Sequence, residues 1–221
     1  MGDVMGLFRT RNYSDSIRLS PLWKRRPLIA LGLLLVGFGA VSQLLLADAS
    51  DDFGNYHNRV FTVVEVADGD TFDIDHPDGA YPDTRIRLWG VDTPEVEGSR
   101  DGAMHFGAEA SAFAKRVLLG RKVRVILSRQ RMRDKYNRLL AYVEFVDDGE
   151  DVHGGESYNE RLIHDGLAYA DWRFDHPLKL QYKRAERVAR ENRIGLWAGV
   201  TLDDMPAWRS RMERELEYNA P

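Results

Sequence analysis

The sequence predicts an α+β fold with a mainly β core: a five-stranded barrel with about three helices, preceded by one N-terminal transmembrane helix. Two observations indicate this class. Five short segments of alternating or β-branched residues occur between residues 59 and 146, and a segment with helical periodicity lies between the third and the fourth. Ahead of them, residues 27–47 contain no charged side chain. A chain of 221 residues suits one compact domain with an appendage.

The uncharged segment 27–47 is long enough to cross a bilayer, because about 20 apolar residues span it as a helix. A polar and basic tail, residues 1–26, precedes it and ends in three cations, whereas three aspartates follow within residues 48–52. The positive-inside rule places the N-terminus in the cytoplasm and residues 48–221 outside it. We therefore expect a single-pass signal anchor in the cell (inner) membrane.

Other interpretations of this segment stay open. Ala47-Asp48-Ala49 matches an A-x-A cleavage pattern, so the chain is alternatively secreted or periplasmic after cleavage near Ala49. The pair Arg25-Arg26 hints at twin-arginine export, although Pro27 follows it. A buried core helix is the third interpretation, and the length and the unequal flanks of the segment argue against it.

The domain that follows has the strand order of a small Greek-key barrel. An acidic linker, residues 48–57, leads into it, and Asp68-Gly69-Asp70 predicts a tight turn after the first strand. A helix over 104–119 separates the third and fourth strands, which is the order of the OB-fold. The expected strands are 59–66, 71–76, 84–91, 122–127 and 139–146.

Two more helices are expected in the domain, which covers residues 58–198. Residues 157–165 precede a glycine that suits a helix end. In the helix over 178–192, the pattern places four apolar side chains on the inner face: Leu180, Ala185, Val188 and Ala189.

Residues 199–221 form an extension with one amphipathic helix. Trp208, Met212 and Leu216 recur at four-residue spacing within 203–218, and we expect this face to pack on the domain. Contact with a partner or with a membrane surface is the alternative. No other feature of the sequence indicates a protein partner.

Composition and charge exclude some classes of site. The chain has no cysteine, so disulfides and thiolate metal sites are excluded. Its net charge of −4 argues weakly against a general nucleic-acid coat. However, residues 115–138 hold ten Lys or Arg and one acid, Asp134. A local basic segment in an otherwise acidic chain favours a groove that binds a polyanion.

Two groups of carboxylates stand beside the strands. Asp68 and Asp70 flank a glycine, and Asp92 and Glu95 flank Thr93-Pro94 directly after the third strand. Oxygen ligands of this kind suit Ca²⁺ or Mg²⁺. Arg87 on the preceding strand, together with Arg138, offers the planar fork that matches phosphate oxygens.

Three motifs together resemble the staphylococcal nuclease (thermonuclease) family over roughly residues 58–198. They are V-A-D-G-D-T at 66–71, R-L-W-G-V-D-T-P-E at 87–95 and D-K-Y-N-R-L-L-A-Y at 134–142. The resemblance implies a Ca²⁺-dependent endonuclease that hydrolyses DNA and RNA with little sequence specificity. It also implies attack by water with departure of the 5′ oxygen, which leaves 3′-phosphate ends.

The resemblance assigns roles residue by residue. The metal ligands are Asp70, Asp92 and the backbone carbonyl of Thr93, with Asp68 close to the metal without binding it. Arg87, Glu95 and Arg138 are the catalytic residues: Glu95 acts as general base or orients the attacking water, and the two arginines bind the phosphate.

Four residues are expected to bind the nucleotide. Lys135 and Tyr136 precede Arg138, whereas Trp172 and Phe174 follow the G-L-A segment, where the type member has tyrosines. An aromatic ring stacks on any base. The chain departs from the family by acidic residues in the loop after Glu95 and by an acidic segment, residues 147–156. The loop puts tight polyanion binding in doubt, and neither departure touches the metal or arginine positions.

An alternative function is a non-catalytic OB-fold module that binds nucleic acid or a protein at the cell envelope. A calcium-stabilised envelope scaffold, with residues 203–218 as the partner site, is a third possibility. The enzyme is favoured over these two alternatives because all five residues that the resemblance assigns to metal binding or catalysis are present: Asp70, Arg87, Asp92, Glu95 and Arg138.

Overall fold

The computed structural model describes residues 52–99, 102–146 and 157–218. The chain divides into two compact units, residues 1–48 and 49–221, and the second is described below. The expected tail and membrane segment, residues 1–26 and 27–47, lie outside the described residues, as does the acidic segment 147–156. Among the residues that are described, no helix has both the length and the apolar character needed to cross a membrane.

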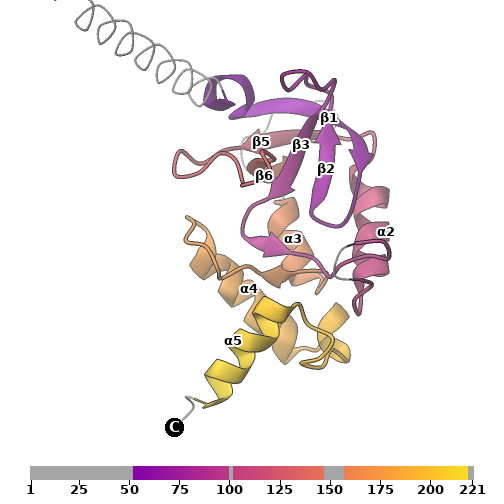
Figure 1. Ribbon diagram of the computed structural model, residues 1–221, viewed down its shortest axis with the longest axis vertical. Helices are drawn as coiled ribbons and strands as arrows, with labels where there is room; N and C mark the ends of the chain where they lie inside the picture. The colour runs from indigo at the N-terminus through magenta and orange to yellow at the C-terminus, as the bar shows by residue number, and fades with distance from the viewer. Residues whose placement is uncertain (1–51, 100–101, 147–156, 219–221) are drawn as a thin grey trace, which may run out of the picture. The chain divides into compact units, whose positions relative to one another are not determined.

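The predicted five-stranded barrel is confirmed, and it closes on itself in the order β1-β2-β3-β6-β5 (Figure 1). Neighbouring strands run antiparallel except β3 and β6, which are parallel. A register shift between Val63 and Glu65 lets β1 pair with β2 on one side and with β5 on the other. The strands are β1 (Arg59–Val66), β2 (Thr71–Ile74), β3 (Thr84–Leu88), β5 (Lys122–Ile126) and β6 (Leu139–Phe145).

Alternating burial explains why these segments form the barrel. In β3, Thr84, Ile86 and Leu88 face the core, whereas Arg85 and Arg87 lie between them on the other face. The third strand ends at Leu88, three residues earlier than predicted, because Trp89 and Gly90 turn the chain and Gly90 adopts a φ of 81°. Such a positive φ favours glycine.

A second, two-stranded sheet follows this turn, and the sequence did not indicate it. Strand β4 (Val91–Asp92) pairs antiparallel with β7 (Tyr169–Ala170). The pairing joins residues nearly eighty positions apart and brings the segment after Ala170 beside the end of β3. It therefore decides what surrounds Asp92.

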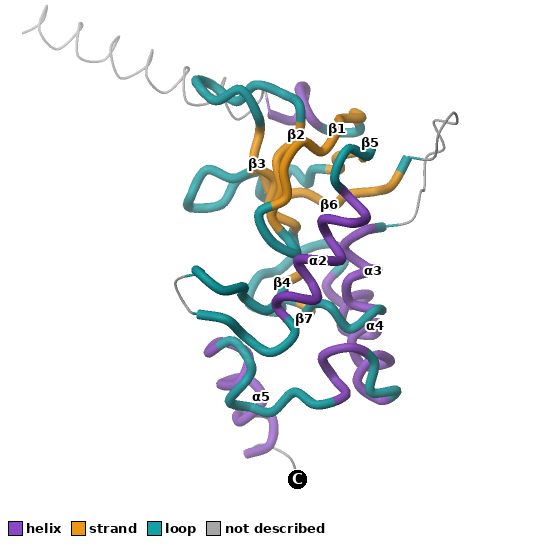
Figure 2. The backbone as a smooth tube through the Cα atoms, turned by 90° about the vertical axis from the view of Figure 1, so that its right-hand side faces the viewer, coloured by secondary structure: helices purple, strands orange, loops and turns teal. Residues whose placement is uncertain are grey.

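Helices α2 to α5 lie beside and beyond one end of the barrel, with α5 farthest from it, whereas a short helical turn at residues 52–56 lies at the opposite end (Figure 2). The four helices predicted within residues 58–221 are all present within a few residues of their expected bounds. They are α2 (Gly107–Leu118), α3 (Tyr158–His164), α4 (Lys179–Glu191) and α5 (Ala207–Tyr218), with a 3₁₀ turn, η2 (Gly195–Ala198), between the last two. The C-terminal extension thus contains the expected helix.

The predicted inner faces of α4 and α5 are partly wrong. Leu180 and Val188 of α4 are exposed, as is Leu216 of α5. The buried positions include Glu186 on α4 and Arg209 and Glu213 on α5. These charged side chains pair with each other, so a hydropathy pattern that places charges outside selects the wrong face.

Candidate functional site

A single cleft of about 620 Å³ collects nearly all the predicted site residues. It lies where the β1–β2 turn, the end of β3 and β4 meet the 131–140 segment and residues 171–174. Of the predicted residues it contains the metal and catalytic sets as well as three of the four nucleotide contacts: Asp68, Asp70, Arg87, Asp92, Thr93, Glu95, Lys135, Tyr136, Arg138 and Phe174.

The turn between β1 and β2 holds Asp70 rigidly. The Asp70 carbonyl accepts a hydrogen bond from the Leu88 amide at 2.9 Å, which ties the turn to β3. Its Oδ2 accepts from the Thr93 amide at 2.9 Å, and its Oδ1 accepts from the Thr71 hydroxyl at 3.0 Å. A Cβ at Gly69 would lie 2.6 Å from the Thr93 methyl, so only glycine lets the two carboxylate segments approach this closely.

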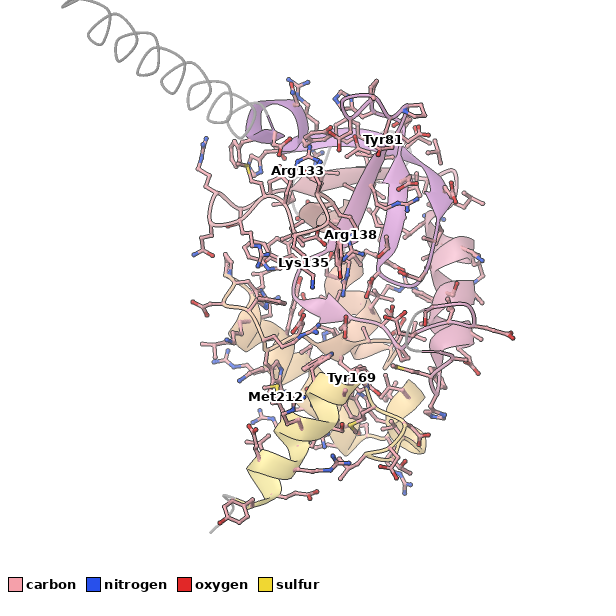
Figure 3. All side chains as sticks on the ribbon, viewed as in Figure 1. Tyr81, Arg133, Lys135, Arg138, Tyr169 and Met212 are labelled. Carbon is pink, nitrogen blue, oxygen red and sulfur yellow. The ribbon has the colours of Figure 1, made fainter. Side chains whose placement is uncertain are left out.

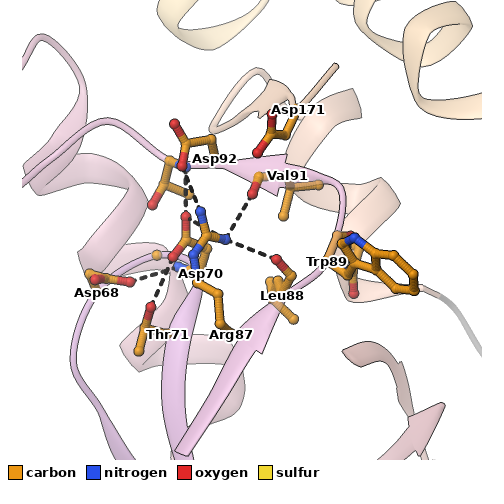
Figure 4. A network of polar contacts seen from close by, with 12 residues as sticks. Asp68, Asp70, Thr71, Arg87, Leu88, Trp89, Val91, Asp92 and Asp171 are labelled. Atoms are coloured by element: carbon orange, nitrogen blue, oxygen red, sulfur yellow. Dashed lines mark hydrogen bonds and ion pairs between the residues drawn. The ribbon is translucent and has the colours of Figure 1, made fainter. Parts of the chain in front are cut away.

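Arg87 links the two predicted metal carboxylates (Figure 4). Its Nη1 lies 3.1 Å from Oδ2 of Asp70, and its Nη2 donates to Oδ1 of Asp92 at 2.6 Å. Nη1 also donates to the carbonyls of Leu88 and Val91. Burial alone lowers the pKa of Arg87, but Asp70 and Asp92 raise it overall, so the guanidinium keeps its charge.

Four aspartates at the site lie beside only two arginines: Asp68, Asp70, Asp92 and Asp171, with Arg87 and Arg173. Burial raises the pKa of Asp68 to about 7, and the neighbouring Asp70 adds to the rise. Burial likewise raises the pKa of Asp92 to about 6, although Arg87 opposes it. A buried group of acids with this imbalance favours the binding of a cation.

The backbone around Glu95 is fixed by the start of α2. The Glu95 carbonyl accepts a hydrogen bond from the Met104 amide at 2.9 Å. A Cβ at Gly107 would collide with that carbonyl, so the first residue of α2 packs directly against it. The half-buried Glu95 side chain lines the cleft beside Asp92 and Thr93.

Arg138 stands at the mouth of the cleft in a turn that Asp134 organises; Figure 3 labels it together with Lys135. Oδ1 of Asp134 accepts from the amides of Tyr136 and Arg138, and its Oδ2 accepts from Nε of Arg138 at 2.8 Å. Tyr136 is exposed, and the cations of Lys135 and Arg138 lie 4.8 and 5.5 Å from its ring centre. The turn therefore presents an aromatic ring and two cations together.

The structure separates the two aromatics that were expected to bind the nucleotide. Phe174 lines the cleft and is 43% exposed, with Cζ of Arg131 and Cζ of Arg173 at 5.4 and 5.6 Å from its ring centre. Trp172 lies outside the cleft and faces α4 and α5. Nζ of Lys183 and Cζ of Arg209 are each 4.3 Å from its ring centre.

Four further residues belong to the site and were missed. Arg131, Asp171 and Arg173 line the cleft, and the indole of Trp208 donates to Oδ2 of Asp92 at 2.7 Å. Residues 172–174 form a turn in which the Arg173 amide donates to Oδ1 of Asp171, so no strand-like alternation marked Asp171 and Arg173 in the sequence. No local signal joins Trp208 to a residue 116 positions away.

The donors at the site suit a calcium ion in their chemistry, since all are oxygens and two are carboxylates. Within residues 52–99, 102–146 and 157–218, no group of three or more His, Cys, Asp or Glu side chains is arranged to hold a metal ion. A metal at Asp70 and Asp92 would thus depend on the Thr93 carbonyl and on water for its remaining ligands.

Comparison with known proteins identifies the family. The family model described as staphylococcal nuclease homologue matches residues 85–199. The thermonuclease of Staphylococcus hyicus is 33% identical over 150 residues, which cover 67% of this chain and 82% of that protein. The thermonuclease of Staphylococcus intermedius is 36% identical over 141 residues, or 62% and 75% of the two chains.

The endonuclease YncB of Bacillus subtilis is 30% identical over 139 residues, which cover 62% of this chain and 61% of that protein. The family-model match covers β5, β6 and nearly all of β3, together with four residues that line the cleft: Arg87, Asp92, Glu95 and Arg138. The chain belongs to the staphylococcal nuclease homologue family.

Proposed function

We propose that this chain is a Ca²⁺-dependent endonuclease that hydrolyses phosphodiester bonds in DNA and RNA and leaves 3′-phosphate ends. That the chain is a nuclease, and thus a hydrolase, follows from the family and from the relatives named above. One observation carries the finer proposal: two carboxylates, a third acid and two arginines line the same cleft.

Each residue has a task that its position supports. Asp70 and Asp92, with the Thr93 carbonyl, would hold the ion, which when bound neutralises charge on the phosphate. Glu95 orients the attacking water or accepts its proton. Arg87 and Arg138 donate to the phosphate oxygens as negative charge builds up.

The two arginines differ in how they can serve the phosphate. Arg87 is 13% exposed at its side chain and is committed to two carboxylates and two carbonyls. Arg138 is 27% exposed, and its contacts within the described residues use Nε and Nη2, both to Asp134. Its Nη1 is therefore the donor best placed for an incoming phosphate oxygen, and Asp134 fixes the plane of the fork.

Low sequence specificity follows from the kind of contacts that the cleft offers. Arginines bind phosphate, and exposed Tyr136 and Phe174 present rings on which any base stacks. Lys135 adds a cation beside Tyr136. None of these groups reads a base edge by itself.

The test is cleavage of single-stranded DNA and of RNA by the purified full chain with Ca²⁺ and then with a chelator. We expect cleavage that needs Ca²⁺, with product ends that accept added nucleotides only after phosphatase treatment. Glu95→Gln should reduce turnover by about 100-fold or more, since general base catalysis contributes that much. Binding of DNA without cleavage in the wild type would show a non-catalytic OB-fold module instead.

We further propose that residues 27–47 anchor the chain in the cell membrane with the nuclease domain outside the cytoplasm. The uncharged run and its basic flank support this orientation. Protease added to cells whose outer barrier has been opened should digest the domain while the inner membrane is intact. Protection until that membrane is lysed would reverse the orientation, and a soluble product that begins near Ala49 would show cleavage.

A further inference from the structure

The C-terminal helix α5 lies beyond the region that the family model matches, yet it reaches the proposed metal site. The indole Nε1 of Trp208 donates to Oδ2 of Asp92 at 2.7 Å. The other oxygen of the same carboxylate accepts from Arg87 at 2.6 Å. Both Asp92 oxygens are therefore held: Oδ1 by the barrel, and Oδ2 by the extension together with Arg173, whose Nη2 lies 3.4 Å from it.

The indole of Trp208 is itself fixed on two sides. Its ring meets the Tyr169 ring edge to face, with centroids 6.5 Å apart. Cζ of Arg173 lies 4.3 Å from the ring centre, and Arg173 is held in turn by two hydrogen bonds to Asp171. The N–H of the indole consequently points at Asp92 in one defined geometry.

A buried ion-pair network anchors the helix that carries Trp208. Arg209, with no exposed surface, donates to both carboxylate oxygens of Glu186 on α4 at 2.8 and 2.9 Å. It also pairs with Glu213 one turn further along α5, and Arg190 pairs with the same Glu213. A helix held this firmly can position a side chain at the site.

We propose that Trp208 is a positioning residue: its indole N–H orients the Asp92 carboxylate for the metal, which makes the C-terminal helix part of the active site. This inference rests on the proposed role of Asp92 as a calcium ligand. A neutral donor suits the task, because it fixes Oδ2 without adding a further positive charge to those of Arg87 and Arg173, which already lie beside this carboxylate. Partners that orient metal-binding side chains typically change affinity or activity by about 10- to 100-fold when removed.

The test compares two Trp→Phe variants of the full chain. Trp208→Phe keeps an aromatic ring beside Tyr169 and Arg173 and removes the N–H. Trp197→Phe is the matched control. The Trp197 indole belongs to the same aromatic cluster, with Cζ of Arg209 5.6 Å from its ring centre, and within the described residues its Nε1 has no hydrogen-bond partner.

Calorimetric titration with CaCl₂ gives the dissociation constant, and thermal unfolding in chelator gives the stability of the metal-free protein. We expect Trp208→Phe to bind Ca²⁺ about 10-fold or more weakly, with a metal-free unfolding midpoint close to that of Trp197→Phe. Trp197→Phe should keep the wild-type Ca²⁺ affinity. In ¹⁵N spectra, the indole signal that is missing in Trp208→Phe should be the one that moves most when Ca²⁺ is added to the wild type.

The outcomes separate this inference from the proposed function. If the wild type binds Ca²⁺ and Trp208→Phe binds it equally well, the role of Trp208 is refuted and the calcium enzyme stands. Equal weakening in both variants would show a general packing effect and would also refute it. If the wild type binds no Ca²⁺, the proposed cofactor fails and the positioning role fails with it.

Discussion

Replacing Arg209 by methionine should release α5 from the rest of the domain. The substitution removes the positive charge that pairs directly with Glu186, which is 1% exposed, and leaves only Arg190, itself paired with Glu213, to oppose the effect of its burial. Burial already raises the pKa of Glu186 against the opposing effect of Arg209. Removing one partner of such a buried pair costs about 3–5 kcal/mol.

Native-state hydrogen exchange measures this loss where it occurs. A tenfold change in an equilibrium constant corresponds to about 1.4 kcal/mol. A loss of about 3–5 kcal/mol therefore predicts that the α5 amides exchange roughly 10²- to 10³-fold faster or more. Amides of β1 and β5 should exchange as in the wild type. Arg211→Met, at an exposed position of the same helix, is the matched control and should change little.

A second substitution tests the cause. Glu186→Gln keeps an oxygen that can accept the Ala170 amide, which Glu186 now does at 2.9 Å, while removing the charge. Arg209→Met combined with Glu186→Gln should therefore recover most of the lost protection. Equal exchange in Arg209→Met and Arg211→Met, or no recovery in the double variant, would refute the electrostatic explanation.

Three further outcomes follow from the site and its surroundings. Arg138→Lys should lower turnover by at least about tenfold, because an ammonium cannot pair with Asp134 through two donors and present a further coplanar donor to the phosphate; wild-type kinetics would contradict the role of Arg138. Gly69→Ala should destabilise the protein by about 1–3 kcal/mol in urea unfolding, since its Cβ would press on Thr93. Burial lowers the pKa of His176, so the unfolded chain binds the extra proton below about pH 6.5, and stability falls with acidity there. His176→Gln should flatten that slope, by up to about 1.4 kcal/mol per pH unit, and a slope equal to the wild type would exclude His176 as its source.

The barrel and the candidate site residues could be predicted because the sequence patterns that indicate them are local. Alternation along a strand and the glycine of Asp68-Gly69-Asp70 depend on neighbours a few positions away. The paired carboxylates and arginines follow from motifs at 66–71, 87–95 and 134–142. The structure gathers these motifs in one cleft, as the resemblance implied.

The surroundings of the site were decided by contacts between distant segments. Pairing of β4 with β7 brings Arg173 beside Asp92, and the same segment turns Trp172 away from the cleft. Residues 172–174 form a turn rather than a strand, so no alternation along the sequence could indicate which of these side chains faces the cleft.

The sequence by itself determined the barrel and its helices and indicated candidate residues for phosphodiester chemistry, because short-range patterns specify strands, turns and motifs. Only the tertiary structure decided that α5 buries Arg209 and directs Trp208 to Asp92. The physical reason is that a buried charge is stable only when its partner is present, and here that partner, Glu186, lies on another helix. A pattern read along one helix therefore assigns Arg209 to the surface, whereas the docked pair places it in the interior.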